Sequence, residues 1–108
     1  MTVPRFDDLI HPATRLSLVA TLAAADWAEF AFLRNGLGLS DSALSKQLTT
    51  LEDAGYVATE RRLEGSRRKL RARLTEQGRD AFDGHVAALR EIVDGAARVS
   101  LGADDTST

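Results

Sequence analysis

The first third of the chain contains two segments in which apolar residues recur every three to four positions, the spacing of an amphipathic helix. The first segment predicts a helix over about 12–24, because proline at its first position fits a helix's opening turn, where the missing amide hydrogen costs nothing. The second predicts a helix over 28–35, with Asp26 as its N-terminal cap. Asn35 and Gly36 supply its stop, because both tolerate a left-handed conformation.

A third helix is predicted over about 40–54, after a short glycine-containing turn. Ser40 is a favourable cap for its start, and Gly55 is a left-handed terminator. Its apolar residues cluster within one narrow arc: Leu44, Leu48 and Leu51. Short hydroxyl side chains and one lysine lie on or beside the opposite face: Ser42, Ser45, Lys46, Thr49 and Thr50. These groups suit close approach to phosphates and base edges, although any amphipathic helix presents a polar outer face.

Beyond this helix the pattern approaches an alternation of apolar and polar residues, over 56–63 and again over 70–74, which predicts two strands. Between them, Glu64, Gly65 and Ser66 contain the turn residues of a hairpin. In the second strand, apolar side chains alternate with arginines, so one face is expected to join the core and the other to be positive. The apolar positions are Leu70, Ala72 and Leu74, and the basic ones are Arg71 and Arg73.

A long last helix is predicted over about 76–100, capped by Thr75. Its apolar residues fall at alternating steps of four and three, as in a coiled-coil seam: Phe82, Val86, Leu89 and Val93. The seam could cover the domain's own core, but its length and terminal position favour a partner helix, so these residues are the predicted dimer interface. Residues 102–108, rich in aspartate, threonine and serine, are predicted to form a disordered tail.

The order of these elements is helix, helix, short turn, helix, hairpin and long helix. This is the order of a winged helix-turn-helix, in which the helix after the turn enters the major groove of DNA. We therefore predict a mainly α fold with a small β-hairpin (α+β), with one domain over 1–101 that includes the C-terminal dimerisation helix. The predicted recognition helix spans 40–54, and the predicted wing, on the backbone or minor groove, spans 61–73.

Composition agrees with one folded domain, since 108 residues with 44% apolar and 28% charged side chains can bury a single core. The chain has no cysteine, which excludes disulfides, thiolate metal sites and a cysteine nucleophile. Its longest apolar stretch, 16–25, is shorter than the roughly 20 residues that span a bilayer. The start lacks the basic leader of a signal peptide, so we expect a cytoplasmic protein without a membrane partner.

The net charge of −2 would by itself argue against a nucleic-acid partner, but the charges are unevenly distributed along the chain. The segment 61–73 carries seven basic residues and one acidic residue, a net charge of +6, which leaves −8 on the rest. A compact basic feature on an acidic body is expected of a phosphate-binding surface. The alternative is a solvated loop without a partner, but such a concentration of cations repels itself when no phosphate is present.

Four stretches also resemble MarR/ArsR-like winged-helix regulators. LSDSALSKQL (39–48) and LEDAGYV (51–57) resemble the family's recognition helix and strand entry. LTEQGR (74–79) resembles its strand-to-helix junction, and IHPATRL (10–16) its opening. The resemblance covers nearly everything from residue 6 to 97, and it is the combination in this order that is specific.

This resemblance implies a bacterial homodimer that binds a palindromic operator in double-stranded DNA and regulates a nearby gene. It places the DNA-reading positions of the third helix on Ser42, Ser45, Lys46, Thr49 and Thr50, and those of the wing on Arg67, Arg68 and Lys69. The chain lacks the cysteines and clustered histidines of metal-sensing members and is shorter than the drug-responsive ones. It is most similar to the compact single-domain members, so no small-molecule effector is evident and no cofactor is expected.

Other functional classes have less support. His11 and His85, the only histidines, are far apart in sequence and lack ligand-spaced neighbours, so we expect packing or surface roles and no metal site. Trp27 could line a small-molecule pocket, but packing is the more common role of a tryptophan. The sequence shows neither a nucleophile paired with a base nor a phosphate-binding glycine loop, so it gives no support for an enzyme. The alternative function is a winged-helix protein-interaction module without sequence-specific DNA binding.

Overall fold

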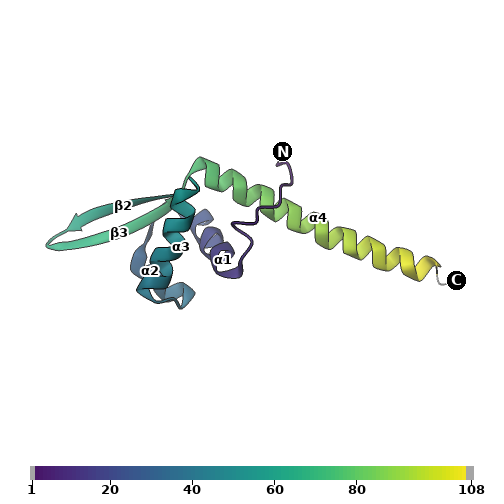
Figure 1. The fold of residues 1–108 in the computed structure, drawn as a ribbon, viewed down its shortest axis with the longest axis horizontal. Helices are drawn as coiled ribbons and strands as arrows, with labels where there is room; N and C mark the ends of the chain where they lie inside the picture. Colours follow the sequence, from purple (N-terminus) through teal and green to yellow (C-terminus); the bar gives the residue numbers. More distant parts are fainter. Residues whose placement is uncertain (1, 107–108) are drawn as a thin grey trace.

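The computed structural model describes residues 2–106, with side chains through residue 102. It contains four helices and a three-stranded sheet, and the wing and the last helix extend from opposite ends of a small helical body (Figure 1). The elements are α1 (Ala13–Ala23), β1 (Ala28–Glu29), α2 (Phe30–Leu37), α3 (Asp41–Asp53), β2 (Val57–Glu64), β3 (Arg67–Leu74) and α4 (Glu76–Thr106). The mainly α fold with a hairpin that the sequence predicts is therefore confirmed, with one extra short strand.

The second helix differs from the prediction at both ends. Ala28 and Glu29 are not helical, because they pair with β3 as the short strand β1. The helix starts at Phe30, so Asp26 is not its cap. It also runs past Asn35 and ends at Gly38, whose φ of 65° is the left-handed conformation that glycine adopts most readily.

The boundaries of α3 agree with the prediction. The Ser40 hydroxyl accepts a hydrogen bond from the Ala43 amide at 3.1 Å, which satisfies one of the free donors of the first turn. Gly55 follows the helix with a φ of 80°. The apolar face of α3 is buried through Leu44, Leu48 and Leu51.

The sheet has the order β1-β3-β2, with both pairings antiparallel. A tight turn at Gly65 and Ser66 joins β2 to β3, so both strands reach further toward the tip than predicted. All seven of the wing's cations therefore lie on paired strands and not on a loop. Because side chains alternate between the faces of a strand, this pairing decides which cations point the same way.

The core lies between α1, α2, α3 and the root of the sheet. Its fully buried side chains come from every helix of the body and from the segment before α1. They include Ile10, Leu18, Leu22, Leu33 and Leu51. This core holds α3 against β2, where the Thr59 hydroxyl also donates to Glu52 Oε2 at 2.7 Å.

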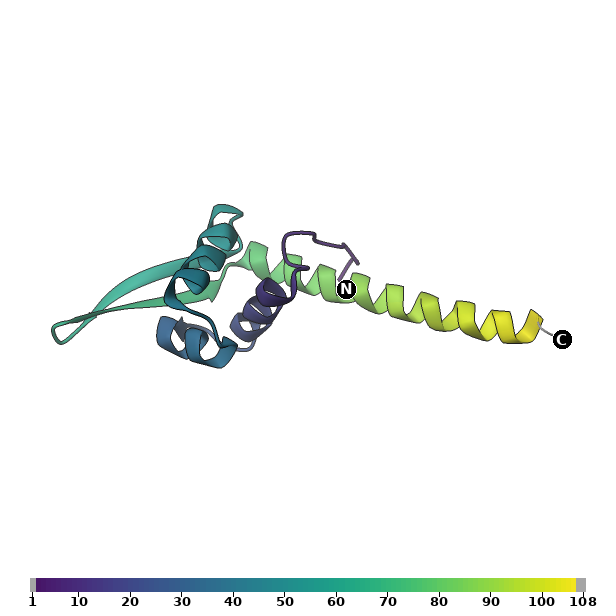
Figure 2. The ribbon, with the colours of Figure 1, turned by 60° about the horizontal axis from the view of Figure 1, so that its bottom comes forward.

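Helix α4 is longer than predicted, because the structure continues it through Thr106, where a tail from residue 102 was expected. Residues 107–108 of that expected tail lie outside the described residues. Thr75 caps the helix as predicted: its hydroxyl accepts from the Gly78 amide at 3.0 Å and donates to the Gly55 carbonyl at 2.6 Å. Figure 2 shows the distal half of α4 leaving the body, which gives the chain an extent of 72 Å along its longest axis.

Candidate nucleic-acid interface

The outer face of α3 carries four of its five predicted DNA-reading residues in exposed positions: Ser42, Ser45, Lys46 and Thr49. Lys46 makes no ion pair within the described part of the chain. Thr50 is only half-exposed, and its hydroxyl donates to the Lys46 carbonyl at 3.0 Å. Thr50 is therefore partly committed to its own helix, and the Ser42 hydroxyl lies 3.4 Å from that of Ser40. Within the described residues, the side chains of Ser45, Lys46 and Thr49 make no such hydrogen bond and point to solvent.

The start of α3 is tied to the helix before it. Arg34 Nη1 lies 2.9 Å from Asp41 Oδ1, so the last turn of α2 and the first turn of α3 are joined by a charged hydrogen bond. Arg34 also donates to the side chain of Asn35 at 3.2 Å. This contact is exposed, so it joins the two helices without contributing much to their stability.

At the wing, the predicted cations differ in how free they are. Arg67 and Arg68 are exposed, next to the turn, and neither forms an ion pair within the described residues. Lys69, in contrast, lies 2.8 Å from Glu64 and 3.7 Å from Glu29. The hydrogen bond from Lys69 lowers the pKa of Glu64, and the same bond raises the pKa of Lys69. Lys69 thus already has carboxylate partners, unlike its two neighbours.

Repulsion among the wing's cations is weaker than the sequence predicts, because two carboxylates besides Glu64 lie close to them. Glu60, just outside the counted segment, accepts a hydrogen bond from Arg71 at 2.9 Å and lies 3.9 Å from Arg62. Glu29 of β1 adds a third carboxylate from a distant part of the chain. Within the described residues, the exposed wing cations without an ion pair are Arg67 and Arg68 beside the turn, and Arg61 and Arg73 further along the strands.

At the root of the wing, Trp27 covers the strand face on which Arg71 and Arg73 stand. The guanidinium of Arg71 lies 4.1 Å from the centre of the indole ring and that of Arg73 lies 5.2 Å away. These distances are typical of cation–π contacts. Trp27 therefore packs, as the sequence predicts, and the pairing of β1 with β3 supplies its arginine partners from a distant part of the chain.

A groove of about 570 Å³ joins the two predicted parts of the interface. Ser45 of α3 faces it from one side, and the wing cations face it from the other. The residues that line it are Glu29, Phe30, Ala31, Asp41, Ser45, Arg67, Arg68, Lys69 and Leu70. The fold thus brings the reading face of α3 and the tip-proximal cations of the wing to one side of the molecule.

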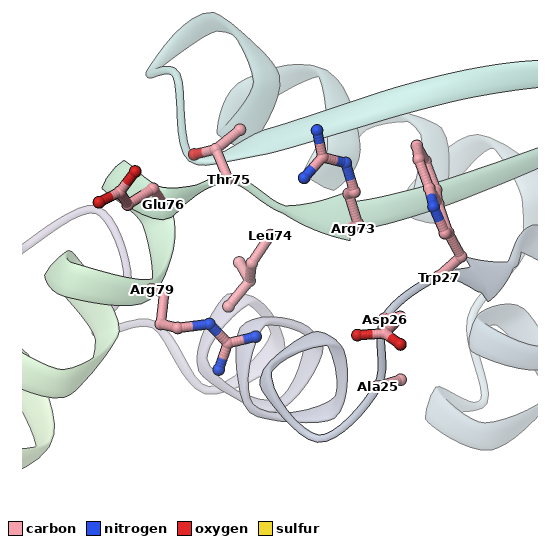
Figure 3. Close-up of a pocket in the computed structure, with 8 residues that line it drawn as sticks. All are labelled: Ala25, Asp26, Trp27, Arg73, Leu74, Thr75, Glu76 and Arg79. Atoms are coloured by element: carbon pink, nitrogen blue, oxygen red, sulfur yellow. The ribbon is translucent and has the colours of Figure 1, made fainter.

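A second hollow, of about 630 Å³, lies where the end of β3, the loop before β1 and the start of α4 meet (Figure 3). Figure 3 shows Arg73 beside Trp27 and Arg79 on the other side of Leu74. Arg79 Nη1 donates to the Ala23 carbonyl at 3.2 Å, which joins α4 to the end of α1. This hollow is a junction between the body and α4.

The predicted dimer residues change from half-buried to exposed along α4. Phe82 packs against the core, and Val86 and Leu89 are half-buried, so this part of the seam covers the domain itself. Val93 is 66% exposed, and three other large apolar side chains of the distal helix are also exposed: Ile92, Val99 and Leu101. The proximal half of the seam therefore covers the domain's own core, and the distal half is exposed in the single chain.

The two histidines, treated as separate in the sequence, lie side by side. His85 is fully buried, and its Nε2 lies 3.3 Å from His11 Nδ1. No group of three or more potential metal ligands occurs in the described part of the chain. Nor does any helix within residues 2–106 combine the length and apolar character needed to cross a membrane.

Comparison with known proteins identifies the family of the chain. Residues 14–93 match the family model described as a winged helix DNA-binding domain. An uncharacterized protein of Methanocaldococcus jannaschii is 27% identical over 84 residues, which cover 78% of this chain and 91% of that protein.

Solved structures share the fold. A transcriptional regulator homologue from Pyrococcus horikoshii superposes with a TM-score of 0.76 at 22% identity, covering 82% of this chain and 87% of the other. ZitR of Lactococcus lactis, a zinc-responsive MarR family member, superposes with a TM-score of 0.61 at 20% identity, covering 86% and 63%. The chain therefore belongs to the family of winged helix DNA-binding domains, and it shares its fold with transcriptional regulators of the MarR type.

Proposed function

We propose that the protein is a dimeric transcriptional regulator that binds a palindromic operator in double-stranded DNA. In this proposal α3 enters the major groove and the wing lies on the backbone or in the adjacent minor groove. The observation that carries it is the groove shared by Ser45 of α3 and the wing residues Arg67 and Arg68. One side of an otherwise acidic chain thus offers both hydrogen-bonding groups for bases and unpaired cations for phosphates.

Within α3, we assign base reading or groove positioning to the four exposed residues Ser42, Ser45, Lys46 and Thr49. A serine or threonine hydroxyl can donate to or accept from a base edge, and lysine reaches the acceptors of guanine. Thr50, whose hydroxyl is bonded to the helix backbone, is assigned a supporting position at the edge of the contact.

Selection of bound sequences from a pool of random duplexes tests this proposal. The wild-type protein should enrich one inverted repeat, and Lys46→Ala or Thr49→Ala should lower the preference for that repeat by about 1–3 kcal/mol per lost base contact. Thr14→Ala, which removes an exposed hydroxyl from α1, is the matched control and should leave the selected sequence unchanged. If a folded dimer enriches no sequence, the protein-interaction alternative is favoured.

We assign dimerisation to the distal half of α4. Its exposed apolar side chains have no partner within the described chain, and a seam at steps of four and three fits a second helix. Val93→Glu should therefore yield a monomer in light scattering, because a carboxylate in an apolar seam loses its hydration. Arg98→Glu, roughly 140° away around the helix, should remain dimeric. A dimer that survives Val93→Glu would place the interface elsewhere.

A further inference from the structure

The segment before α1 is held against α4 by specific hydrogen bonds. The Arg5 amide donates to the Gly84 carbonyl at 2.9 Å, and the Asp7 amide donates to His85 Nδ1 at 3.0 Å. The approach is close, because a Cβ on Gly84 would lie 3.3 Å from the Val3 carbonyl oxygen. Figures 1 and 2 both show this N-terminal segment running beside α4. We call residues 2–10 the strap.

The strap is also tied to the body. The carboxylate of Asp7 accepts from the amides of Leu9 and Ile10 through Oδ1 and from the Tyr56 hydroxyl through Oδ2 at 2.6 Å. This hydrogen bond to Asp7 raises the pKa of Tyr56. The Arg15 side chain donates to the Leu9 carbonyl. The strap is thus a structured part of the domain, and its two hydrogen bonds to α4 end on Gly84 and His85.

The hydrogen bonds at His85 determine where its proton lies. An amide N–H can only donate, so Nδ1 of His85, which faces the Asp7 amide, must be an unprotonated acceptor. Neutral His85 therefore carries its proton on Nε2, which donates to His11 Nδ1 at 3.3 Å. The ring of Phe6 packs against both imidazoles, with centroid distances of 4.7 and 4.8 Å. The arrangement requires both histidines to be neutral.

Protonation of either imidazole places two donors face to face. A proton on His85 Nδ1 would oppose the Asp7 amide, and a proton on His11 Nδ1 would oppose His85 Nε2. Burial, followed by the charge of His11, lowers the pKa of His85, whereas Asp7 and Asp8 oppose this shift. Three further charged groups lie along the strap: Arg5 and Asp80 line a hollow with Asp7 and Gly84, and Arg15 of α1 donates to the Leu9 carbonyl.

We propose that His11, His85 and the Asp7 amide form a proton-sensitive latch that releases the strap from α4 on acidification. His85 is neutral in the latched state, so the unlatched state binds protons more readily, and the latch weakens as pH falls below the ordinary histidine value of about 6.5. Above that value both states are neutral and the latch is fully formed. Release would also move Thr2 away from Phe82 and Val86, with which it lines one hollow on α4.

A spin label on the strap tests the latch, because the chain has no cysteine and Val3→Cys adds a single exposed attachment point. The full-length labelled protein should lose its immobilised spectral component between pH 7.5 and pH 5.0. In the His11→Gln, His85→Gln background, neutral amides can accept and donate as the imidazoles do, so the label should stay immobilised at both pH values. A label that stays immobilised in the wild type at pH 5.0, or is released equally in the glutamine background, overturns the proposal.

Imidazole and amide ¹⁵N spectra of the unsubstituted protein provide a second measurement, which does not depend on whether a substituted protein folds. At pH 7.5 His85 should be the Nε2–H tautomer, and its titration should shift the Asp7 and Arg5 amides together. A Nδ1–H tautomer, or a titration that leaves both amides unmoved, overturns the latch. Far-UV circular dichroism should show unchanged helix content over the same range; helix loss in step with label release would mean unfolding and would also overturn it.

Discussion

Changing Arg67 and Arg68 together to alanine is expected to flatten the slope of log affinity for DNA against log salt by about 1.8, because each lost phosphate contact contributes about 0.9. Both cations are exposed and lack ion pairs within the described residues, so they are available to displace counterions from the duplex. Affinity should fall for all sequences alike, because phosphates carry no sequence information. Binding titrations at several salt concentrations, with operator and unrelated duplexes, measure both effects.

The control for this experiment is a second pair of arginines with the same charge. Arg90 and Arg98 are exposed on α4, far from the wing, so Arg90→Ala with Arg98→Ala changes the net charge equally without touching the proposed contact. This pair should leave the salt slope close to that of the wild type. Equal flattening by both pairs would attribute the effect to overall charge, and an unchanged slope for the wing pair would remove the wing tip from the interface.

Gly78→Ala is expected to destabilise the fold by at least about 3 kcal/mol, which is a large part of the stability of a small domain. A Cβ at this position would lie 2.0 Å from the carbonyl oxygen of Tyr56. That oxygen accepts the Thr75 amide at 3.0 Å, so neither backbone can move without breaking the junction between the wing and α4. Thermal unfolding should show a drop in melting temperature of roughly 12 °C or more.

Gly36→Ala is the matched control. Gly36 lies inside α2, and a Cβ there would meet nothing within 4 Å. Because alanine loses less backbone entropy than glycine in a helix, this change should stabilise the protein by about 0.5–1 kcal/mol. If the Gly78→Ala protein is as stable as the wild type, the Tyr56 carbonyl oxygen must lie further from Gly78 than in the structure.

The elements that the sequence predicts well are those set by neighbouring residues. The start of α3 follows from the Ser40 side chain and its end from Gly55, and both signals lie within a few positions of the boundary. The start of α4 follows from Thr75 in the same way. Capping signals of this kind can be recognised from a few adjacent residues, without knowing how the rest of the chain folds.

The features that the sequence did not predict depend on contacts between distant residues. Strand β1 has two residues, too few for an alternating pattern, and exists because Ala28 pairs with Ala72. Within the candidate site, the partnership of Lys69 with Glu29 follows from that same pairing. The contact between His11 and His85 joins positions 74 residues apart. Each of these requires the folded arrangement of the sheet or of α4 before it can be recognised.

The stacking of Trp27 on Arg71 has a practical consequence for spectroscopy. The chain has one tryptophan, so all indole emission comes from the root of the wing, 4.1 Å from a guanidinium. Indole fluorescence responds to nearby charge and to solvent access, and this indole is half-buried between β1 and the strand that leads to the tip. The protein thus carries an intrinsic fluorescent reporter at the root of its wing, with no need for an added dye.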